Sequence, residues 1–182
     1  MKINAPQDLE LAEKIKSATR IGLGQDSHGF EEEKEKLLVL GGVLIPNEKG
    51  LKGNSDGDVI LHALFNSVSQ AIGERSISYY ADKMCLEQGI TDSKEYLKVI
   101  LNKLKEKNYK INNVGIMIEA KKPKLEPYHA KIKQSLSNLL KINKEQIGLT
   151  FTSGESLTDF GKGLGIQCFV ITTLNKNEQA NS

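Results

Sequence analysis

The sequence predicts an α/β fold, an α+β sandwich with a single mixed sheet and helices packed on one of its faces. Helical and strand patterns alternate along the chain, as in Tyr96 to Leu104 and then Val114 to Ile118, which is typical of mixed α/β layers. Two further strand patterns, Ile147 to Phe151 and Gly165 to Leu174, close the chain like a hairpin. A sheet covered on one face needs cover on the other, and oligomerisation is one solution.

The first half of the chain is expected to contain three short strands and one helix after an N-terminal helical extension at residues 1–19. The strands are Arg20 to Gly24, Leu37 to Leu40 and Val43 to Ile45, the last stopped by Pro46. A glycine-rich loop follows, and Ser55-x-x-Asp58 resembles a capping box with Asp in place of Glu or Gln. The helix that it starts should run to about Ile72.

The second half shows no clear period between Gly73 and Asp82 and becomes regular again at Asp92-x-x-Glu95, which is predicted to cap a helix. Pro123 and Pro127 then bracket a rigid loop before a third helix. The apolar faces of these two helices are Tyr96, Val99, Ile100 and Leu104, and then Ile132, Leu136 and Leu139. The polar tail 175–182 is expected to be disordered.

Composition excludes several classes of protein. A chain of 182 residues fits one domain with a sizeable core. The formal net charge is only +2, so no global field indicates binding to nucleic acid or to an anionic membrane. No apolar run approaches membrane-spanning length, and the first residues lack the apolar core of a signal peptide. Cys85 and Cys168 form no Cys-x-x-Cys motif, which favours free thiols in a reducing, cytoplasmic compartment.

Asp26 and His28 form the pattern around which the chemistry is organised. Residues two apart on a strand point to the same side, so the carboxylate and the imidazole converge on one point. With His62, on the helix after the glycine-rich loop, they would leave one coordination position open, as catalytic zinc sites do. The alternatives are a turn carboxylate beside a partly buried histidine, and a histidine that belongs to the core.

Several motifs in a fixed order resemble one known family, 2-C-methyl-D-erythritol 2,4-cyclodiphosphate synthase of the non-mevalonate isoprenoid pathway. The resemblance covers Arg20 to Leu174, which it identifies as the catalytic domain 20–174. The motifs are Asp26-Ser27-His28, Gly41-Gly42-Val43-x-Ile45-Pro46, Gly50-Leu51, Ser55-Asp56-Gly57-Asp58-Val59, His62-Ala63-Leu64, Pro123-Lys124, Glu155-x-Leu157 and Gly161-Lys162-Gly163-x-Gly165. The family's lyase reaction converts 4-diphosphocytidyl-2-C-methyl-D-erythritol 2-phosphate to the cyclic diphosphate and CMP.

The resemblance also implies a homotrimer with active sites between subunits, and it assigns roles to individual residues. A divalent metal, usually zinc, would be held by Asp26, His28 and His62, and a second ion, magnesium or manganese, by Glu155. Asn54 and Ser153 occupy the catalytic positions. The positions that match the binding of the cytidine diphosphate-linked substrate are Asp26, Ser27, His28, Asn54, Ser55, Ser76, Ile77, Ser78, Ala120, Lys121, Lys122, Pro123, Lys124, Leu125, Glu126, Thr152, Ser153, Gly154, Glu155, Asp159 and Lys162.

Four positions depart from the family pattern. The family usually has His at Asn54, Thr at Ser153, Asp at Ser76 and Arg at Lys162. Asn and Ser still donate hydrogen bonds, whereas Ser76 brings no charge and Lys162 lacks the planar fork of arginine. Two other classes stay open. The same metal ligands could support a metal-dependent nucleotide phosphohydrolase if water reached the site, and Ser76 and Asn54 suggest a catalytically weakened nucleotide-binding trimer. Without the resemblance, the lysines of Ala120 to Glu126 would be read as a solvated basic loop, and Thr152 to Glu155 as an ordinary turn.

Overall fold

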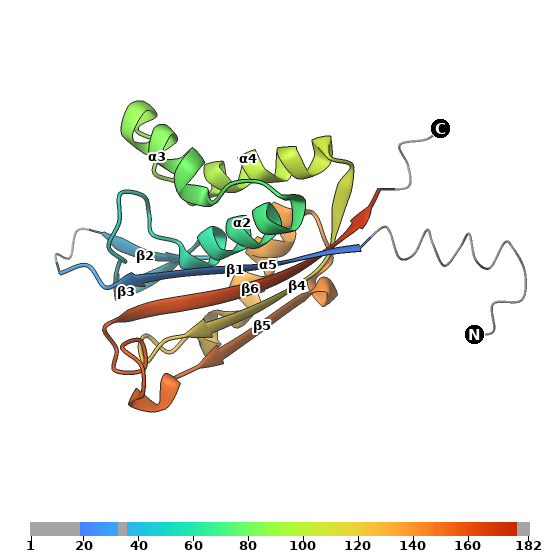
Figure 1. Cartoon of the computed structure of the whole chain (residues 1–182). Coiled ribbons are helices and arrows are strands. Elements are labelled where there is room, and N and C mark those ends of the chain that lie inside the picture. Colours follow the sequence, from blue (N-terminus) through green and yellow to red (C-terminus); the bar gives the residue numbers. More distant parts are fainter. Residues whose placement is uncertain (1–18, 33–35, 178–182) are drawn as a thin grey trace, which may run out of the picture.

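The computed structural model describes residues 19–32 and 36–177, and a four-stranded sheet with helices on one face forms its body (Figure 1). The predicted N-terminal helix at residues 1–19 lies outside the described residues except for Thr19, which starts the first strand. The elements are β1 Thr19–Gly29, β2 Leu37–Leu40, β3 Val43–Lys49, α2 Val59–Ile72, α3 Ile77–Gln88, α4 Ser93–Glu106, β4 Tyr109–Glu119, α5 His129–Leu140, β5 Ile147–Thr152 and β6 Gly165–Lys176, with short 3-10 turns η1 Glu126–Tyr128, η2 Lys144–Gln146 and η3 Gly154–Ser156.

The strand order in the main sheet is β1-β6-β4-β5. β6 runs antiparallel to both β1 and β4, whereas β4 and β5 are parallel. The predicted mixed sheet with helices on one face is confirmed, but the predicted hairpin of β5 and β6 is wrong. Because parallel strands need a crossover, α5 carries the chain from β4 back to β5. β6 then enters the middle of the sheet, between β1 and β4.

β2 and β3 form a separate two-stranded sheet, so the prediction of a single sheet was incomplete. β3 also continues past Pro46 to Lys49, against the prediction that proline would stop it. The pairing register shifts between Leu37 and Leu38, opposite this part of β3. Proline is tolerated at such an irregularity because its missing N–H interrupts no regular ladder.

Helix α2 begins at Val59 and ends at Ile72, the predicted end. Its cap is Asp58 and not the predicted Ser55. The buried Asp58 carboxylate accepts hydrogen bonds from the backbone of Ile60 and Leu61 and from Gly41 and Gly42 in the β2–β3 turn, the last two at 2.8 and 2.6 Å. Burial raises the pKa of Asp58 to about 6, against the opposing effect of these hydrogen bonds. One carboxyl group therefore fixes both the helix start and the hairpin beside it.

The region without a clear period contains helix α3, which the sequence did not predict. None of its residues is buried, so it has no apolar stripe to detect. Helix α4 is confirmed: Asp92 caps it by accepting a hydrogen bond from the Lys94 backbone, and Tyr96, Ile100 and Leu104 are buried. Val99 of the predicted face is only half-buried, whereas Leu97 is buried.

In α5 the buried residues are Ile132, Leu136 and Leu140, so the last position of the predicted face shifts from Leu139 to Leu140. β6 continues to Lys176, so Asn175 and Lys176, which were predicted to belong to a disordered tail, are part of a strand. Residues 178–182 of that tail lie outside the described ranges. Within those ranges, no helix has the length and apolar character needed to cross a membrane.

The face of the sheet that the helices leave open is unusually apolar. Ile21, Leu23, Met117 and Ile171 are 41 to 67% exposed there, on three neighbouring strands. Leu23 lies directly opposite Ile171 across the β1–β6 pair. Single exposed apolar side chains are common on protein surfaces, whereas large apolar patches are typical of surfaces that another molecule covers.

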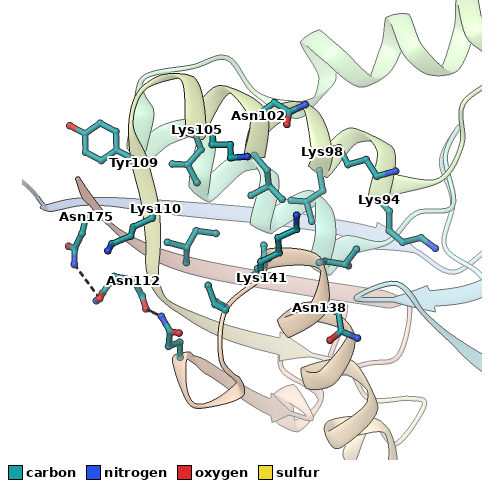
Figure 2. A pocket seen from close by; sticks show the side chains of 18 residues that line it. Lys94, Lys98, Asn102, Lys105, Tyr109, Lys110, Asn112, Asn138, Lys141 and Asn175 are labelled. Atoms are coloured by element: carbon teal, nitrogen blue, oxygen red, sulfur yellow. Dashed lines mark hydrogen bonds between the residues drawn. The ribbon is translucent and has the colours of Figure 1, made fainter. Parts of the chain in front are cut away.

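A hollow of about 920 Å³ lies between α4, the start of β4 and the end of α5 (Figure 2). Leucine and isoleucine side chains contribute to its lining, together with five lysines. The lysines are Lys94, Lys98, Lys105, Lys110 and Lys141. No carboxylate or histidine is among the lining residues within the described ranges, and none of the predicted site residues is either. The candidate chemistry of this chain therefore lies elsewhere.

Candidate metal and active site

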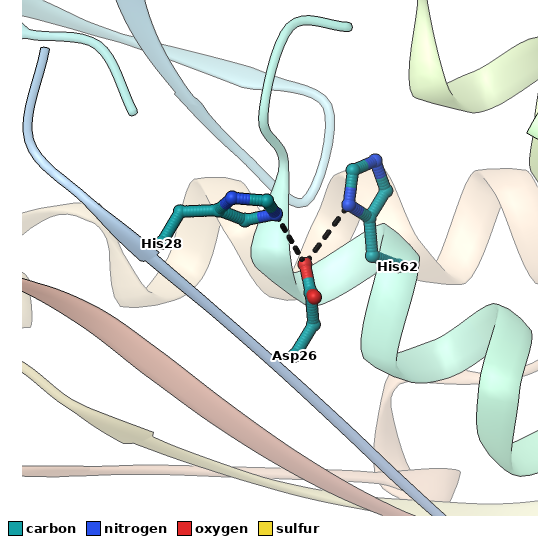
Figure 3. Close-up of side chains that lie close together, drawn as sticks. All are labelled: Asp26, His28 and His62. Carbon is teal, nitrogen blue, oxygen red and sulfur yellow. Dashed lines mark hydrogen bonds and ion pairs between the residues drawn. The ribbon is translucent and has the colours of Figure 1, made fainter. Parts of the chain in front are cut away.

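Asp26, His28 and His62 come together as the sequence predicted (Figure 3). One oxygen of Asp26, Oδ2, lies 3.0 Å from His28 Nε2 and 2.9 Å from His62 Nδ1. One ligand atom from each residue can be chosen so that all three lie within 4.8 Å of one another. His62 is 7% exposed, so its ring is held almost entirely inside the protein.

Two elements position these side chains. β1 extends to Gly29, so Asp26 and His28 lie within the strand and not at its end as predicted, and they share one face of it. Ser27 points to the opposite face by the same alternation. His62 occupies the first turn of α2, which packs directly on β1 because Gly22 and Gly24 place no side chain between helix and strand. This close approach brings the ring to the carboxylate.

The electrostatics of the cluster favour an ionised carboxylate. Burial by itself would raise the pKa of Asp26, but hydrogen bonds and charge from His28 and His62 outweigh it and lower the pKa to about 2. One carboxylate oxygen and two imidazole nitrogens form the donor set of an open, catalytic type of metal centre. The three residues thus fit a divalent metal ion.

The loop before α2 lies against this cluster. The Ser55 hydroxyl lies 3.3 Å from His62 Nε2, and it accepts a hydrogen bond from the Gly57 backbone at 3.2 Å. Asn54 is exposed, and its backbone carbonyl oxygen accepts a hydrogen bond from the Cys85 thiol of α3. The structure therefore brings the predicted loop residue Ser55 to the Asp26–His28–His62 cluster.

A second group of predicted residues lines a smaller pocket of about 240 Å³. It joins the loop after β4 to the end of β5, two segments that are far apart in sequence. Ile118 and Phe151 complete the lining with the predicted residues Ala120, Lys121, Pro123, Lys124, Leu125, Glu126, Thr152 and Ser153. Lys122 is not among the lining residues; its ammonium lies 5.8 Å from the centre of the Phe30 ring.

Glu155 is not part of the Asp26–His28–His62 cluster. It is exposed and has a positive φ of 47°, a left-handed conformation that costs energy for a residue other than glycine. The Ser153 hydroxyl donates a hydrogen bond to its carboxylate at 3.0 Å. Asp159 and Lys162 form an exposed ion pair at 3.1 Å. Ser76 precedes α3 as its cap residue, and Ile77 and Ser78 begin that helix.

Residues 19–175, nearly all of the described chain, match the family model of the YgbB family. The chain belongs to the YgbB family. The 2-C-methyl-D-erythritol 2,4-cyclodiphosphate synthase of Chlamydia felis is 40% identical over 173 residues, covering 94% of this chain and 97% of that protein. The resemblance predicted from the sequence motifs is thereby confirmed, and it places the chain in a family of lyase-class enzymes.

Solved structures of YgbB-type proteins share the fold. IspF of Plasmodium falciparum, in a CDP complex, has a TM-score of 0.76 and 32% identity, covering 88% of this chain and 97% of that one. The bifunctional IspDF from Campylobacter jejuni has a TM-score of 0.80 and 27% identity over 87% of this chain. The chain spans only 42% of that bifunctional protein. The predicted architecture, one main mixed sheet with helices, is therefore that of the solved relatives.

Two residues near the Asp26–His28–His62 cluster of this YgbB-family chain, Ser93 and Asp56, were not predicted as site residues from the sequence. Ser93 is buried at the first position of α4, where its hydroxyl lies 2.8 Å from His62 Nε2. Asp56 accepts hydrogen bonds from both the backbone and the hydroxyl of Ser93. Asp56 belongs to the family motif Ser55-Asp56-Gly57-Asp58-Val59, but the motif predicted no function for its side chain. No periodicity marks Ser93, because its importance arises only where α4 meets α2.

Proposed function

We propose that this chain is a metal-dependent 2-C-methyl-D-erythritol 2,4-cyclodiphosphate synthase. It converts 4-diphosphocytidyl-2-C-methyl-D-erythritol 2-phosphate to the cyclic diphosphate and releases CMP. The observation that carries the proposal is the convergence of Asp26, His28 and His62 in a chain of this family. Residues 20–174 make up the catalytic unit, and the free thiols of Cys85 and Cys168 support a cytoplasmic location.

Asp26, His28 and His62 would hold zinc, which supplies Lewis-acid polarisation of phosphate oxygens when bound. Glu155 would hold a second divalent ion, magnesium or manganese, because a carboxylate is the hard oxygen ligand that these ions prefer. The left-handed backbone at Glu155 supports a functional role, since strained residues of this kind concentrate at active sites.

The substrate's own 2-phosphate is the nucleophile, so the chain needs no base to generate one. What its residues supply is positioning and charge stabilisation for a folded polyanion. Asn54 and Ser153 act as hydrogen-bond donors to the phosphates, in the positions where the family usually has His and Thr. The other phosphate and erythritol contacts come from Ser55, Ser76, Ile77, Ser78, Asp159 and Lys162, and from the backbone of Ser27, whose side chain points to the opposite face of β1.

The cytidine end of the substrate binds at the pocket between the Ala120–Glu126 loop and Thr152 and Ser153, with Lys122 and Gly154 beside it in sequence. Backbone donors and acceptors of a stiff, proline-containing loop can read a cytosine edge with little loss of conformational entropy. The small volume of this pocket, about 240 Å³, suits one end of the substrate and not the whole molecule. The CDP complex of the related Plasmodium IspF supports a cytidine diphosphate-linked ligand.

The proposal is tested by incubating the pure protein with zinc, magnesium and the cytidine substrate and following the reaction by phosphorus NMR. We expect resonances of the cyclic diphosphate and of CMP in equal amounts. CMP with the open-chain bisphosphate, or free inorganic phosphate, in place of the cyclic product would identify a nucleotide phosphohydrolase. An unchanged spectrum, with the substrate shown to bind, would identify a nucleotide-binding protein that has lost catalysis.

We further propose a homotrimer with active sites between subunits. The apolar open face of the sheet, with Ile21, Leu23 and Ile171, supports burial against other copies of the chain. In such a trimer, the metal ligands of one subunit face the cytidine pocket and Glu155 of the next. The family pattern supports this arrangement of the two halves.

Mixing two inactive variants tests the trimer. His62→Ala removes one half of each site and Glu155→Ala removes the other. After dissociation and reassociation of equal amounts, about a quarter of the interfaces should combine two intact halves and regain activity. Light scattering before and after mixing measures the mass of the particles. Monomers, or mixed trimers without any regained activity, would contradict shared sites.

A further inference from the structure

We infer that Ser93, held by Asp56, positions His62 by fixing which ring nitrogen carries the proton. The inference rests on the proposed metal site and adds two residues to it. Both act through His62, so they are positioning residues and not ligands. In this role Ser93 and Asp56 would tune the affinity of the site for zinc.

The contacts form a continuous chain from one carboxylate to the other. Asp26 Oδ2 lies 2.9 Å from His62 Nδ1, and the opposite ring nitrogen, Nε2, lies 2.8 Å from the Ser93 hydroxyl. That hydroxyl donates a hydrogen bond to Asp56 Oδ1, and the Ser93 backbone N–H donates to Asp56 Oδ2 at 3.1 Å. Ser93 is only 1% exposed, so its hydroxyl lies in the interior beside the ring.

The direction of these hydrogen bonds decides the tautomer. A serine hydroxyl has one proton, and Ser93 uses it to donate a hydrogen bond to the Asp56 carboxylate, which can only accept. The Ser93 oxygen must then accept a hydrogen bond from the N–H at His62 Nε2. When the ion is bound, a histidine protonated at Nε2 directs the lone pair of Nδ1 toward it, and this nitrogen lies on the Asp26 side of the ring. The geometry therefore aims the metal-binding nitrogen of His62 at the other ligands.

Asp56 is itself fixed on both sides. It accepts a hydrogen bond from the Asp58 backbone at 3.1 Å, and its own backbone N–H donates to the Thr91 carbonyl at 2.8 Å. It thus joins the start of α2 to the start of α4, and the ring of His62 lies between them. Ser55 also approaches His62 Nε2, but at 3.3 Å, and the shorter contact at 2.8 Å assigns the role to Ser93.

The test measures zinc affinity by competition with a chromophoric chelator. Removing the hydrogen-bond partner of a metal-binding histidine typically lowers the metal affinity by about 10- to 100-fold. We expect this loss of zinc affinity for Ser93→Ala. Ser67→Ala is the matched control. Ser67 is a buried serine of α2 whose hydroxyl bonds to Leu64 and Thr172, away from the cluster. An unchanged affinity in Ser93→Ala, or an equal loss in Ser67→Ala, would overturn the inference.

A second variant keeps the test independent of the folding of the first. Asp56→Asn should weaken zinc binding by a smaller factor, because an amide oxygen holds the Ser93 proton less firmly. Since Asp56 acts through Ser93, its substitution should have no further effect in the Ser93→Ala background. An equal loss in both backgrounds would mean that Asp56 acts by another route, against the inference.

Nitrogen-15 NMR reads the tautomer directly, and the chain has only three histidines to assign. In the zinc-loaded wild type, His62 should be protonated at Nε2; a proton at Nδ1 would refute the inference. A wild type without measurable zinc affinity would overturn the inference together with the metal site. Phosphorus NMR still reports on the cyclisation in that case, so failure of the proposed function is recognised separately.

Discussion

The His62→Ala variant is expected to purify without zinc and to lose about 1000-fold in turnover of the cytidine substrate, which corresponds to about 4 kcal/mol of transition-state stabilisation. Only one oxygen ligand from Asp26 and one nitrogen ligand from His28 would remain, and two ligands are too few to retain the ion. Elemental analysis and steady-state kinetics on the same preparation measure both effects.

His129→Ala is the matched control for this experiment. His129 begins α5, and its ring contacts the edge of Phe151 at 6.0 Å between centroids, outside the Asp26–His28–His62 cluster. It should retain full zinc occupancy. Full occupancy in His62→Ala as well would exclude His62 as a ligand, and turnover without zinc would show that the reaction does not depend on this centre.

Gly24→Ala is expected to destabilise the fold more strongly than an ordinary overpacked core substitution, which costs about 1 to 3 kcal/mol. A Cβ at Gly24 would lie 1.9 Å from the Ala63 carbonyl oxygen and 2.5 Å from the Ser67 nitrogen. Both are backbone atoms of α2, which cannot rotate away as a side chain would. Helix α2 must therefore move off β1, and His62 moves with it.

Urea unfolding at a fixed protein concentration measures this loss. Gly29→Ala on the same strand is the control, because its Cβ would meet its nearest neighbour, the Leu164 carbonyl oxygen, at an ordinary 3.5 Å. The control should stay within about 1 kcal/mol of the wild type. Equal unfolding midpoints for the two variants would show that α2 and β1 are not in direct backbone contact.

The sequence was informative where a local pattern decides the structure. Asp26 and His28 share a face because strands alternate, and α4 was found because Tyr96, Ile100 and Leu104 repeat at helical spacing. α3 was missed because a helix that buries no residue has no such repeat. The cap of α2 was misplaced because Asp58 is fixed by Gly41 and Gly42, which are distant in sequence.

Contacts between distant segments account for the remaining errors. The place of β6 between β1 and β4 follows from pairing partners more than a hundred residues away in β1, which no local window contains. The role of Ser93 likewise depends on the meeting of α2 and α4. Only the family motifs, which record such long-range constraints indirectly, brought Ala120 to Glu126 and Thr152 to Glu155 into one hypothesis. In the structure, residues of the first segment line one pocket with Thr152 and Ser153 of the second.

The central position of β6 has a consequence for the order in which the protein forms on the ribosome. Residues 165–176 are translated after every other element, yet they join β1 to β4. Until they emerge from the exit tunnel, β1 has no partner in the main sheet, and α2 has no complete surface on which to pack. The nascent chain must therefore keep apolar strands such as β1 exposed through most of its synthesis, a state in which chaperones protect chains from aggregation.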